Sequence, residues 1–119
     1  MKTLYITTIL VLFAATLVGQ DNSVPFEKSI FKERKDEFKI AVEHMEKADE
    51  IYAYGPSVWS QAIDGFEKAQ AFNPKNATLN YKLGDCYLYS NYKTKSLKFF
   101  QTAYKLNPAI QLDIHFIKF

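Results

Sequence analysis

The side chains best suited to acid–base or metal chemistry in this 119-residue chain are two histidines, and they lie far apart. His44 and His115 have no second histidine or cysteine at the short spacing that metal-binding motifs use. Asp113 lies two residues before His115, and on a helix such a pair points in different directions. The sequence also contains no glycine-rich phosphate loop and no nucleophile motif. We therefore expect no catalytic residue, no metal site and no cofactor, and a protein that is not an enzyme.

Cys86 is the only cysteine of the chain, so it cannot form an internal disulfide. It follows Asp85 within a predicted helix, at a position where small apolar residues pack. We expect a buried and unreactive thiol rather than a reactive one.

Aromatic residues and lysines are interspersed between Tyr81 and Phe100, a composition that can bind single-stranded nucleic acid. The same aromatic residues recur at helical spacing, however, which favours a packed core and a groove lining. The formal net charge of +2 gives no general attraction to nucleic acid either. We therefore expect no nucleic-acid partner.

The charge is unevenly distributed along the chain. Residues 21–76 contain eight basic and eleven acidic side chains, whereas residues 77–119 contain six basic and two acidic ones. Copies of the chain could attract each other head to tail, or the two halves could have differently solvated surfaces. The second interpretation is the simpler one.

Four pairs of residues share a separation of 34 positions, which is the period of the tetratricopeptide repeat, a pair of antiparallel helices. The pairs are Ala62 and Ser96, Phe66 and Phe100, Ala69 and Ala103, and Pro74 and Pro108. On the first helix of the complete repeat, Leu83, Gly84 and Tyr87 fit the same pattern. We expect Gly84 to face the small side chains of Ser96 and Ala103, with Tyr87 and Phe100 beside them.

These elements predict an all-α fold, in which tetratricopeptide-repeat hairpins form a short right-handed solenoid over residues 31–119. Apolar spacing predicts helices over about 31–54, 57–72 and 77–90, a fourth ending at Leu106, and a fifth after Pro108. The expected helix-capping residues are Ser57, Asn76, and either Asn91 or Thr94. The domain divides into an atypical repeat (31–76), a full repeat (77–110) and a truncated third repeat (111–119).

The first repeat departs from the pattern, because Glu50 stands where Gly84 stands one period later. A loop longer by about two residues would let Ala48 take the place of the small residue.

The N-terminus is typical of a targeting segment. Lys2 precedes an uncharged and mostly apolar run over residues 4–18, and the chain becomes polar at Gly19 and Gln20. We expect residues 1–20 to be a cleaved signal peptide, which would leave no transmembrane segment in an exported protein. Residues 21–30 are expected to form an extended arm, whose Phe26 and Ile30 would fold back onto the first helix.

The first helix of each hairpin lines the inner face in this type of repeat, so the candidate protein-binding groove consists of Thr78, Tyr81, Asp85 and Leu88. This set suits an extended peptide or a helix, with Tyr81 as the aromatic anchor. The alternative is that these residues only contact neighbouring repeats.

The last residues, including Ile114, Phe116, Ile117 and Phe119, are mostly apolar, and no partner helix for them is evident in the sequence. They could be covered by another molecule, including a second copy, or the chain could be the N-terminal part of a longer protein. We expect the second.

The residues Leu79–Gly84, Cys86–Leu88 and Asp113–His115, in this order after a signal-like segment, resemble the N-terminal tetratricopeptide region of Bacteroidetes cell-envelope proteins. In that family a propeller segment and an OmpA-like peptidoglycan-binding domain follow. The present sequence contains neither, and Lys118 replaces the usual glycine of the third repeat. The resemblance implies an assembly module in the periplasm or at the periplasmic face of the outer membrane, which binds an envelope protein or peptide. The alternative it leaves open is a spacer that positions a peptidoglycan-binding domain and has no ligand of its own.

Overall fold

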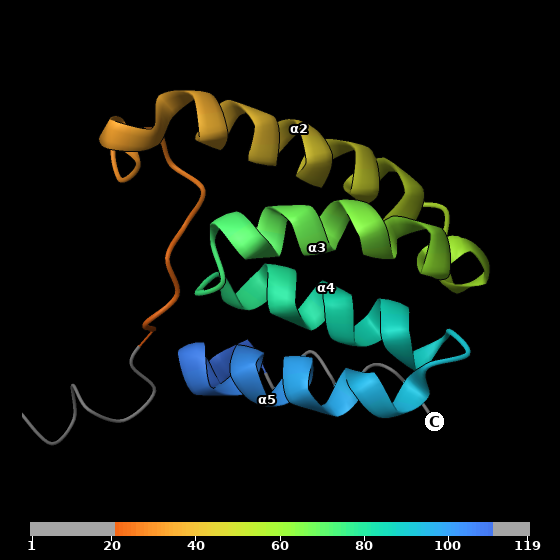
Figure 1. Ribbon diagram of the computed structural model, residues 1–119. Helices are drawn as coiled ribbons and strands as arrows, with labels where there is room; N and C mark the ends of the chain where they lie inside the picture. The colour runs from red at the N-terminus through yellow and green to blue at the C-terminus, as the bar shows by residue number, and fades with distance from the viewer. Residues whose placement is uncertain (1–20, 111–119) are drawn as a thin grey trace, which may run out of the picture.

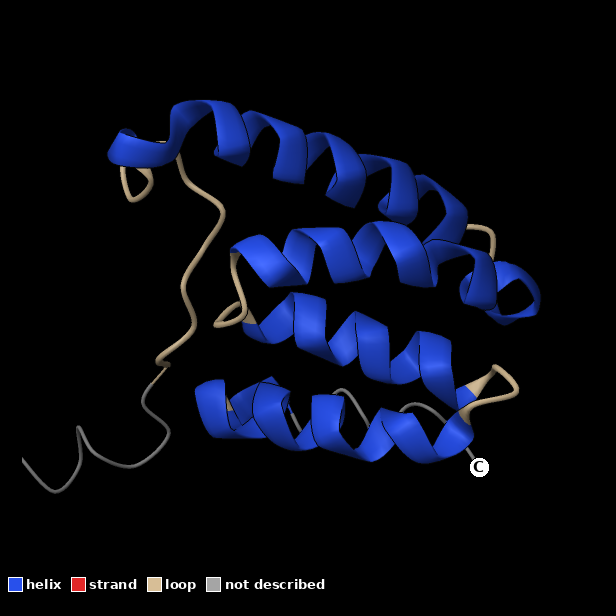
Figure 2. Ribbon diagram, in the orientation of Figure 1, coloured by secondary structure: helices blue, strands red, loops and turns tan. Residues whose placement is uncertain are grey.

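A computed structural model describes residues 21–110 of the chain, and these residues contain only helices, turns and loops (Figure 2). The expected signal peptide and the truncated third repeat therefore lie outside the described residues. The α-helices of the described part are α2 (Lys35–Tyr52), α3 (Ile63–Phe72), α4 (Ala77–Leu88) and α5 (Ser96–Leu106). The short 3-10 helices are η1 (Lys32–Arg34), η2 (Pro56–Ala62), η3 (Lys93–Lys95) and η4 (Pro108–Ile110). The expected all-α class is confirmed for this part of the chain.

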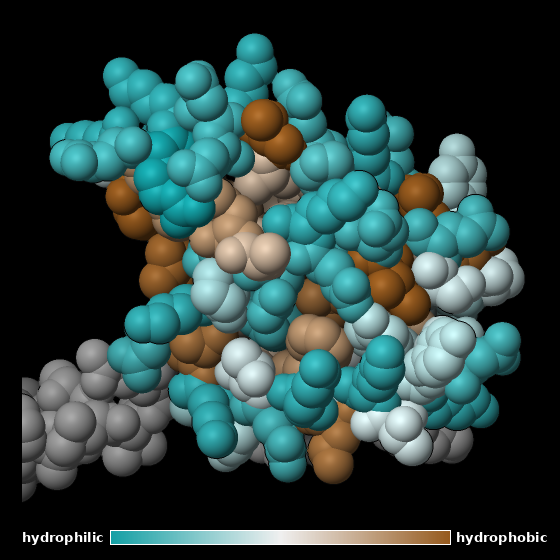
Figure 3. Space-filling view, viewed as in Figure 1, coloured by the Kyte–Doolittle hydropathy of each residue, from teal (hydrophilic) through white to brown (hydrophobic). Residues whose placement is uncertain are grey.

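The four α-helices of the described part lie side by side in chain order, each running opposite to the one before it (Figure 1). The most extensive packing is between α2 and α3 and between α4 and α5, and α3 also packs on α4. The described chain thus consists of two helical hairpins placed next to each other. Hydrophilic residues cover most of the face seen in Figure 3, and the hydrophobic residues on it are scattered between them.

The main core lies between the two hairpins. Its buried residues are Ala48, Ala62, Phe66, Ala69, Leu79, Leu83, Cys86, Tyr87 and Phe99. Cys86 is fully buried, as expected from the sequence. A smaller cluster of Ala77, Ala103 and Ile110 joins the start of α4 to the end of α5.

The second helix of each hairpin ends in the same way. α3 ends at Phe72 and α5 at Leu106, 34 residues later. At both ends an asparagine follows, and the backbone N–H groups of Asn73 and Asn107 donate to the carbonyls of Ala69 and Ala103. The end of the helix therefore repeats with the period seen in the sequence.

Two of the expected helix caps are not formed. Ser57 does not cap a helix, because Gly55, with a φ of 107°, turns the chain into η2, which begins at Pro56. Trp59 holds η2 in place, since its indole N–H donates to the carbonyl of Tyr52 at 2.8 Å and its ring stacks on the Tyr52 ring. At the start of the fourth helix, neither Asn91 nor Thr94 makes a side-chain cap, because η3 comes before α5.

Asn76 caps α4 as expected from the sequence. Its side-chain oxygen accepts a hydrogen bond from the backbone N–H of Leu79 at 2.8 Å, which satisfies one of the N–H groups that lack a partner within the helix.

The close approach of the helices at Gly84 differs from the expectation. The three atoms nearest to the position of a Cβ on Gly84 all belong to the Phe100 ring, at 2.5 to 2.9 Å, and not to Ser96 or Ala103. The glycine therefore makes room for an aromatic ring. In the first hairpin, Ala48 and Gly65 meet instead, because a Cβ on Gly65 would lie 3.0 Å from that of Ala48. Ala48 is buried and Glu50 is exposed, which agrees with the two-residue shift expected for this repeat.

The N-terminal arm crosses the ends of α3, α4 and α5 instead of lying along α2 (Figure 1). The backbone N–H of Asn22 donates to the carbonyl of Leu106 at 2.7 Å, and that of Val24 donates to the carbonyl of Lys75 at 2.8 Å. The arm thus connects the loop between α3 and α4 with the end of α5.

Side chains fix the arm further. The carbonyl of Val24 accepts hydrogen bonds from the side-chain amides of Asn73 and Asn76 at 2.9 and 3.0 Å. The hydroxyl of Ser23 accepts one from the backbone N–H of Ala77 at 2.8 Å. Because polar groups of the arm and of the helix ends satisfy each other, the arm forms part of the folded domain.

The expected contacts of Phe26 and Ile30 with the first helix are corrected by the structure. Phe26 pairs with Phe72 at the end of α3, with ring centroids 6.5 Å apart, and Ile30 is 48% exposed. Phe31 makes the expected kind of contact in their place, since its ring stacks on that of Phe38 in α2 at 5.6 Å.

Candidate functional site

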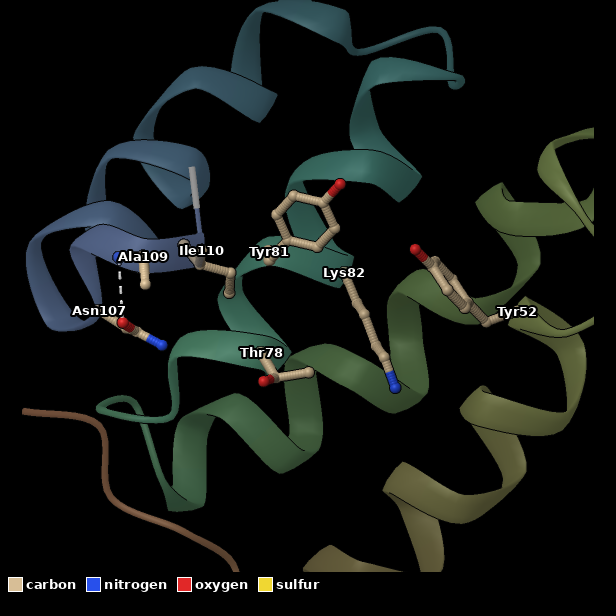
Figure 4. Close-up of a pocket in the computed structure, with 7 residues that line it drawn as sticks. All are labelled: Tyr52, Thr78, Tyr81, Lys82, Asn107, Ala109 and Ile110. Carbon is tan, nitrogen blue, oxygen red and sulfur yellow. Dashed lines mark hydrogen bonds between the residues drawn. The ribbon is translucent and has the colours of Figure 1, made fainter. Parts of the chain in front are cut away.

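A hollow of about 340 Å³ lies beside α4, where α2, α4 and the segment after α5 meet (Figure 4). It is lined by Tyr52, Thr78, Tyr81, Lys82, Asn107, Ala109 and Ile110. Two of the four candidate groove residues, Thr78 and Tyr81, are among them. Thr78 is exposed and Tyr81 is half-buried, and the Tyr81 ring packs against that of Phe100 at 5.7 Å.

The positive charge of the hollow is balanced. The ammonium group of Lys82 lies 2.6 Å from a carboxylate oxygen of Asp49 on α2, and both side chains are partly exposed. The same ammonium group lies 5.5 Å from the centre of the Tyr52 ring. The hollow therefore offers aromatic and aliphatic surface with a paired lysine, instead of a free charge.

Asp85 does not line the hollow, which corrects the sequence-based assignment. It is 1% exposed, and one of its carboxylate oxygens accepts a hydrogen bond from the hydroxyl of Tyr52. Its other oxygen has no hydrogen-bond partner among the described residues. Burial raises the pKa of Asp85 to about 6, although the hydrogen bond from Tyr52 acts in the opposite direction. The residue joins α2 to α4 and is inaccessible to a ligand.

Burial likewise raises the pKa of the Tyr52 hydroxyl above its usual value, and the hydrogen bond to Asp85 adds to the effect. Tyr52 therefore remains a neutral hydrogen-bond donor at physiological pH.

Leu88, the fourth candidate groove residue, is half-buried near the end of α4 and lies outside the hollow. When the two extra loop residues of the first repeat are counted, equivalent positions on α2 and α4 lie 36 residues apart. Leu88 on α4 then corresponds to Tyr52 on α2. That correspondence is the sequence signal that would have placed Tyr52 at the site. No comparable sequence signal points to Asn107 or Ile110, which reach the hollow only because the chain turns back after α5.

A second depression, of about 610 Å³, lies along the first half of α2. Its apolar residues are Phe31, Phe38 and Val42, and its edge carries three lysines and three acidic residues. Val42 corresponds to Thr78 at the same separation of 36 residues. The two hollows therefore involve equivalent positions of α2 and α4.

Most of the residues expected to pack the repeats are buried. The structure buries Ala62, Phe66, Ala69, Leu83, Gly84, Tyr87, Ser96 and Ala103, leaves Phe100 and Pro108 half-buried, and exposes Pro74. Tyr87 also has a polar role that the sequence did not predict, because its hydroxyl donates to the carboxylate of Glu67 on α3. That contact is a second bridge between the two hairpins.

Over residues 21–110 the structure brings together no group of three histidine, cysteine or acidic side chains that could hold a metal ion. His44 is half-buried on α2, and His115 lies outside the described residues. Within the same range, no helix is both long enough and apolar enough to span a membrane.

Comparison with known proteins adds no relative. The chain matches no protein-family model, and no curated protein or solved structure is significantly similar to it. Its function must therefore be inferred from its own residues and their geometry.

Proposed function

We propose that the protein is an exported, non-catalytic interaction scaffold of the bacterial cell envelope, built from tetratricopeptide-type hairpins. The observation that carries this proposal is the hollow beside α4, where the exposed Thr78 and the aromatic Tyr81 lie next to Ile110. The repeated helix ends at Phe72 and Leu106, and the antiparallel order of the helices, support the repeat architecture.

The ligand that suits the hollow is a short protein segment, either extended or helical. Tyr81 and Tyr52 offer rings for an apolar side chain, while Thr78 and Asn107 offer polar groups for a peptide backbone (Figure 4). The equivalent positions on α2, represented by Val42, would extend the same surface along a longer ligand.

The location rests on the sequence. The signal-like segment over residues 1–20 and the resemblance to envelope proteins support a place in the periplasm or at the periplasmic face of the outer membrane. On the same grounds we infer that the chain is the N-terminal part of a longer envelope protein. Fractionation of cells that produce a tagged protein tests the location, and recovery in the cytoplasm would contradict it.

The alternative function, a spacer without a ligand, predicts a groove filled by the N-terminal arm. The arm instead binds the helix ends through Asn22 and Val24, and none of its residues lines the hollow beside α4. This arrangement favours binding over a purely mechanical role.

A peptide selection tests the proposed binding. Random peptides displayed on phage are enriched on the purified protein, and their affinities are measured for the wild type and for two tyrosine variants. Tyr81→Ala should weaken binding at least about tenfold, as expected when an aromatic anchor is lost. Tyr54→Ala removes a tyrosine that is 83% exposed outside the hollow, and it should leave the affinity unchanged.

If no peptide is enriched, or if the two variants weaken binding equally, the hollow is not the binding site and the spacer function is preferred.

A further inference from the structure

The surface of α5 carries two exposed apolar side chains. Leu97 is 62% exposed and Tyr104 is 44% exposed, and a separation of seven residues places them on one side of the helix, two turns apart. Lys98 and Lys105 follow them directly and are also exposed. From Cys86 to Leu112 the sequence contains no acidic residue, so this surface is basic.

The equivalent position in the first hairpin is covered. Ile63 lies 34 residues before Leu97, at the start of α3, and it is partly buried against the main core. There, α4 follows and packs on α3. The surface around Leu97 is thus of the kind that receives the first helix of another hairpin.

The opposite end of the helix array offers a helix of complementary charge. Glu43 and Glu50 on α2 are exposed and are also seven residues apart. The exposed Glu46 and Lys47 lie between them, so the segment from Glu43 to Glu50 keeps a net negative charge. Ile40, one turn before Glu43, is 54% exposed. Figure 1 places α2 and α5 at the two ends of the array of described helices, and the exposed side chains named above lie on these two helices.

We propose that α5 of one copy packs antiparallel against the exposed face of α2 of a second copy, which extends the array head to tail. The antiparallel direction continues the alternation of α2 to α5 within one chain (Figure 1). The equal spacing of seven residues brings Lys98 opposite Glu50 and Lys105 opposite Glu43 at the same time. In this register, Ile40 of the second copy lies about one helical turn from the position opposite Tyr104. The contact therefore also covers apolar surface next to the ion pairs.

Such a contact joins two different surfaces, so it does not close on itself and further copies can add at each end. Exposed ion pairs contribute little individually and are screened by salt. The association is therefore weak, increases with concentration and decreases at high ionic strength. It does not involve the residues that line the hollow beside α4.

Charge reversal on each surface tests the proposal. One variant carries Lys98→Glu and Lys105→Glu, and the other carries Glu43→Lys and Glu50→Lys. Sedimentation velocity over a range of concentrations at low salt should show association of the wild type. Each variant alone should associate at least about tenfold more weakly, because like charges then face each other.

An equal mixture of the two variants should associate again. The unchanged α5 of one variant meets the unchanged α2 of the other, and the two reversed surfaces are also complementary. The matched control is Lys75→Glu, which reverses an exposed charge in the loop between α3 and α4 and should associate like the wild type.

A wild type that stays monomeric at all concentrations would overturn the proposal, and would mean that another segment or another protein covers α5. Association that the Glu43 and Glu50 changes leave intact would overturn it as well, since a contact between two α5 helices does not involve α2.

Discussion

The hydroxyl group of Tyr52 on α2 donates a hydrogen bond to the carboxylate of Asp85 on α4, and so connects the two helical hairpins. Asp85 is the only buried acidic residue within residues 21–110. Beside it, Lys82 and Asp49 form an ion pair between the same two helices. Polar contacts thus fix how the hairpins are placed relative to each other, next to the candidate binding hollow.

The buried carboxyl group should make the stability depend on pH. Because the pKa of Asp85 is raised from 3.8 to about 6, the folded state holds this proton more tightly than the unfolded state does. The stabilisation that comes from the protonated Asp85 is therefore complete below about pH 4 and is lost as the pH rises through 6. Asp85→Asn keeps an oxygen that accepts from Tyr52 and has no charge to bury. The melting temperature of this variant relative to the wild type should increase between pH 4 and pH 7.

The control is Asp85→Ala, which leaves the hydroxyl of Tyr52 without its partner. It should lower the stability by about 1–3 kcal/mol, the usual cost of an unsatisfied buried polar group. Parallel melting curves of the wild type and Asp85→Asn across this pH range would show that the carboxyl group does not titrate as described.

Gly84 should not tolerate a side chain. A Cβ at this position would lie 2.5 Å from the ring of Phe100, so Gly84→Ala should lower the free energy of unfolding by about 1–3 kcal/mol, and Gly84→Leu by more. Urea denaturation measures the change. In a Phe100→Ala background the same glycine substitution should cost much less. An equal cost in both backgrounds would place the origin of the effect elsewhere.

Asn76 has two roles, because it caps α4 and also binds the arm at Val24. Asn76→Ala should therefore destabilise the protein by about 1–2 kcal/mol. Asn91 is exposed and makes no side-chain cap, so Asn91→Ala should change the stability by less than about 0.5 kcal/mol. Thermal unfolding of both variants decides the point, and similar losses would be evidence against the capping role of Asn76.

The thiol of Cys86 should be unreactive in the folded protein. Burial raises its pKa to about 12, and the negative charge of Asp85 adds to the effect. At pH 8 an aromatic disulfide reagent should label the native protein far more slowly than the urea-unfolded protein. Labelling at the same rate in both states would mean that α4 opens readily at this position.

The sequence predicted the helices better than their contacts. The apolar spacing on α2 and the capping residue of α4 are local features, and the structure has both. The 3-10 helices before α3 and α5 were missed, because Trp59 holds the first of them through contacts with Tyr52 that no local pattern shows.

Of the four candidate groove residues, Thr78 and Tyr81 line the hollow, whereas Asp85 and Leu88 do not. Thr78, Tyr81 and Asp85 follow one helical face, but which part of that face stays open depends on the neighbouring helix. Tyr52 covers Asp85, while the chain that turns back after α5 brings Ile110 next to Tyr81. Both contacts join residues distant in sequence, and spacing within one helix cannot reveal them.

The arm also has a consequence for the order of folding. Asn22 binds the carbonyl of Leu106, so two residues near opposite ends of the described chain must come together before this bond can form. Contacts between distant residues form late, because closing a long loop costs entropy that the intervening structure must first reduce. The arm leaves the ribosome before any of the helices, yet we expect it to be the last part of the domain to reach its native position. The N-terminal arm, which is synthesised before the helices, would then complete the fold.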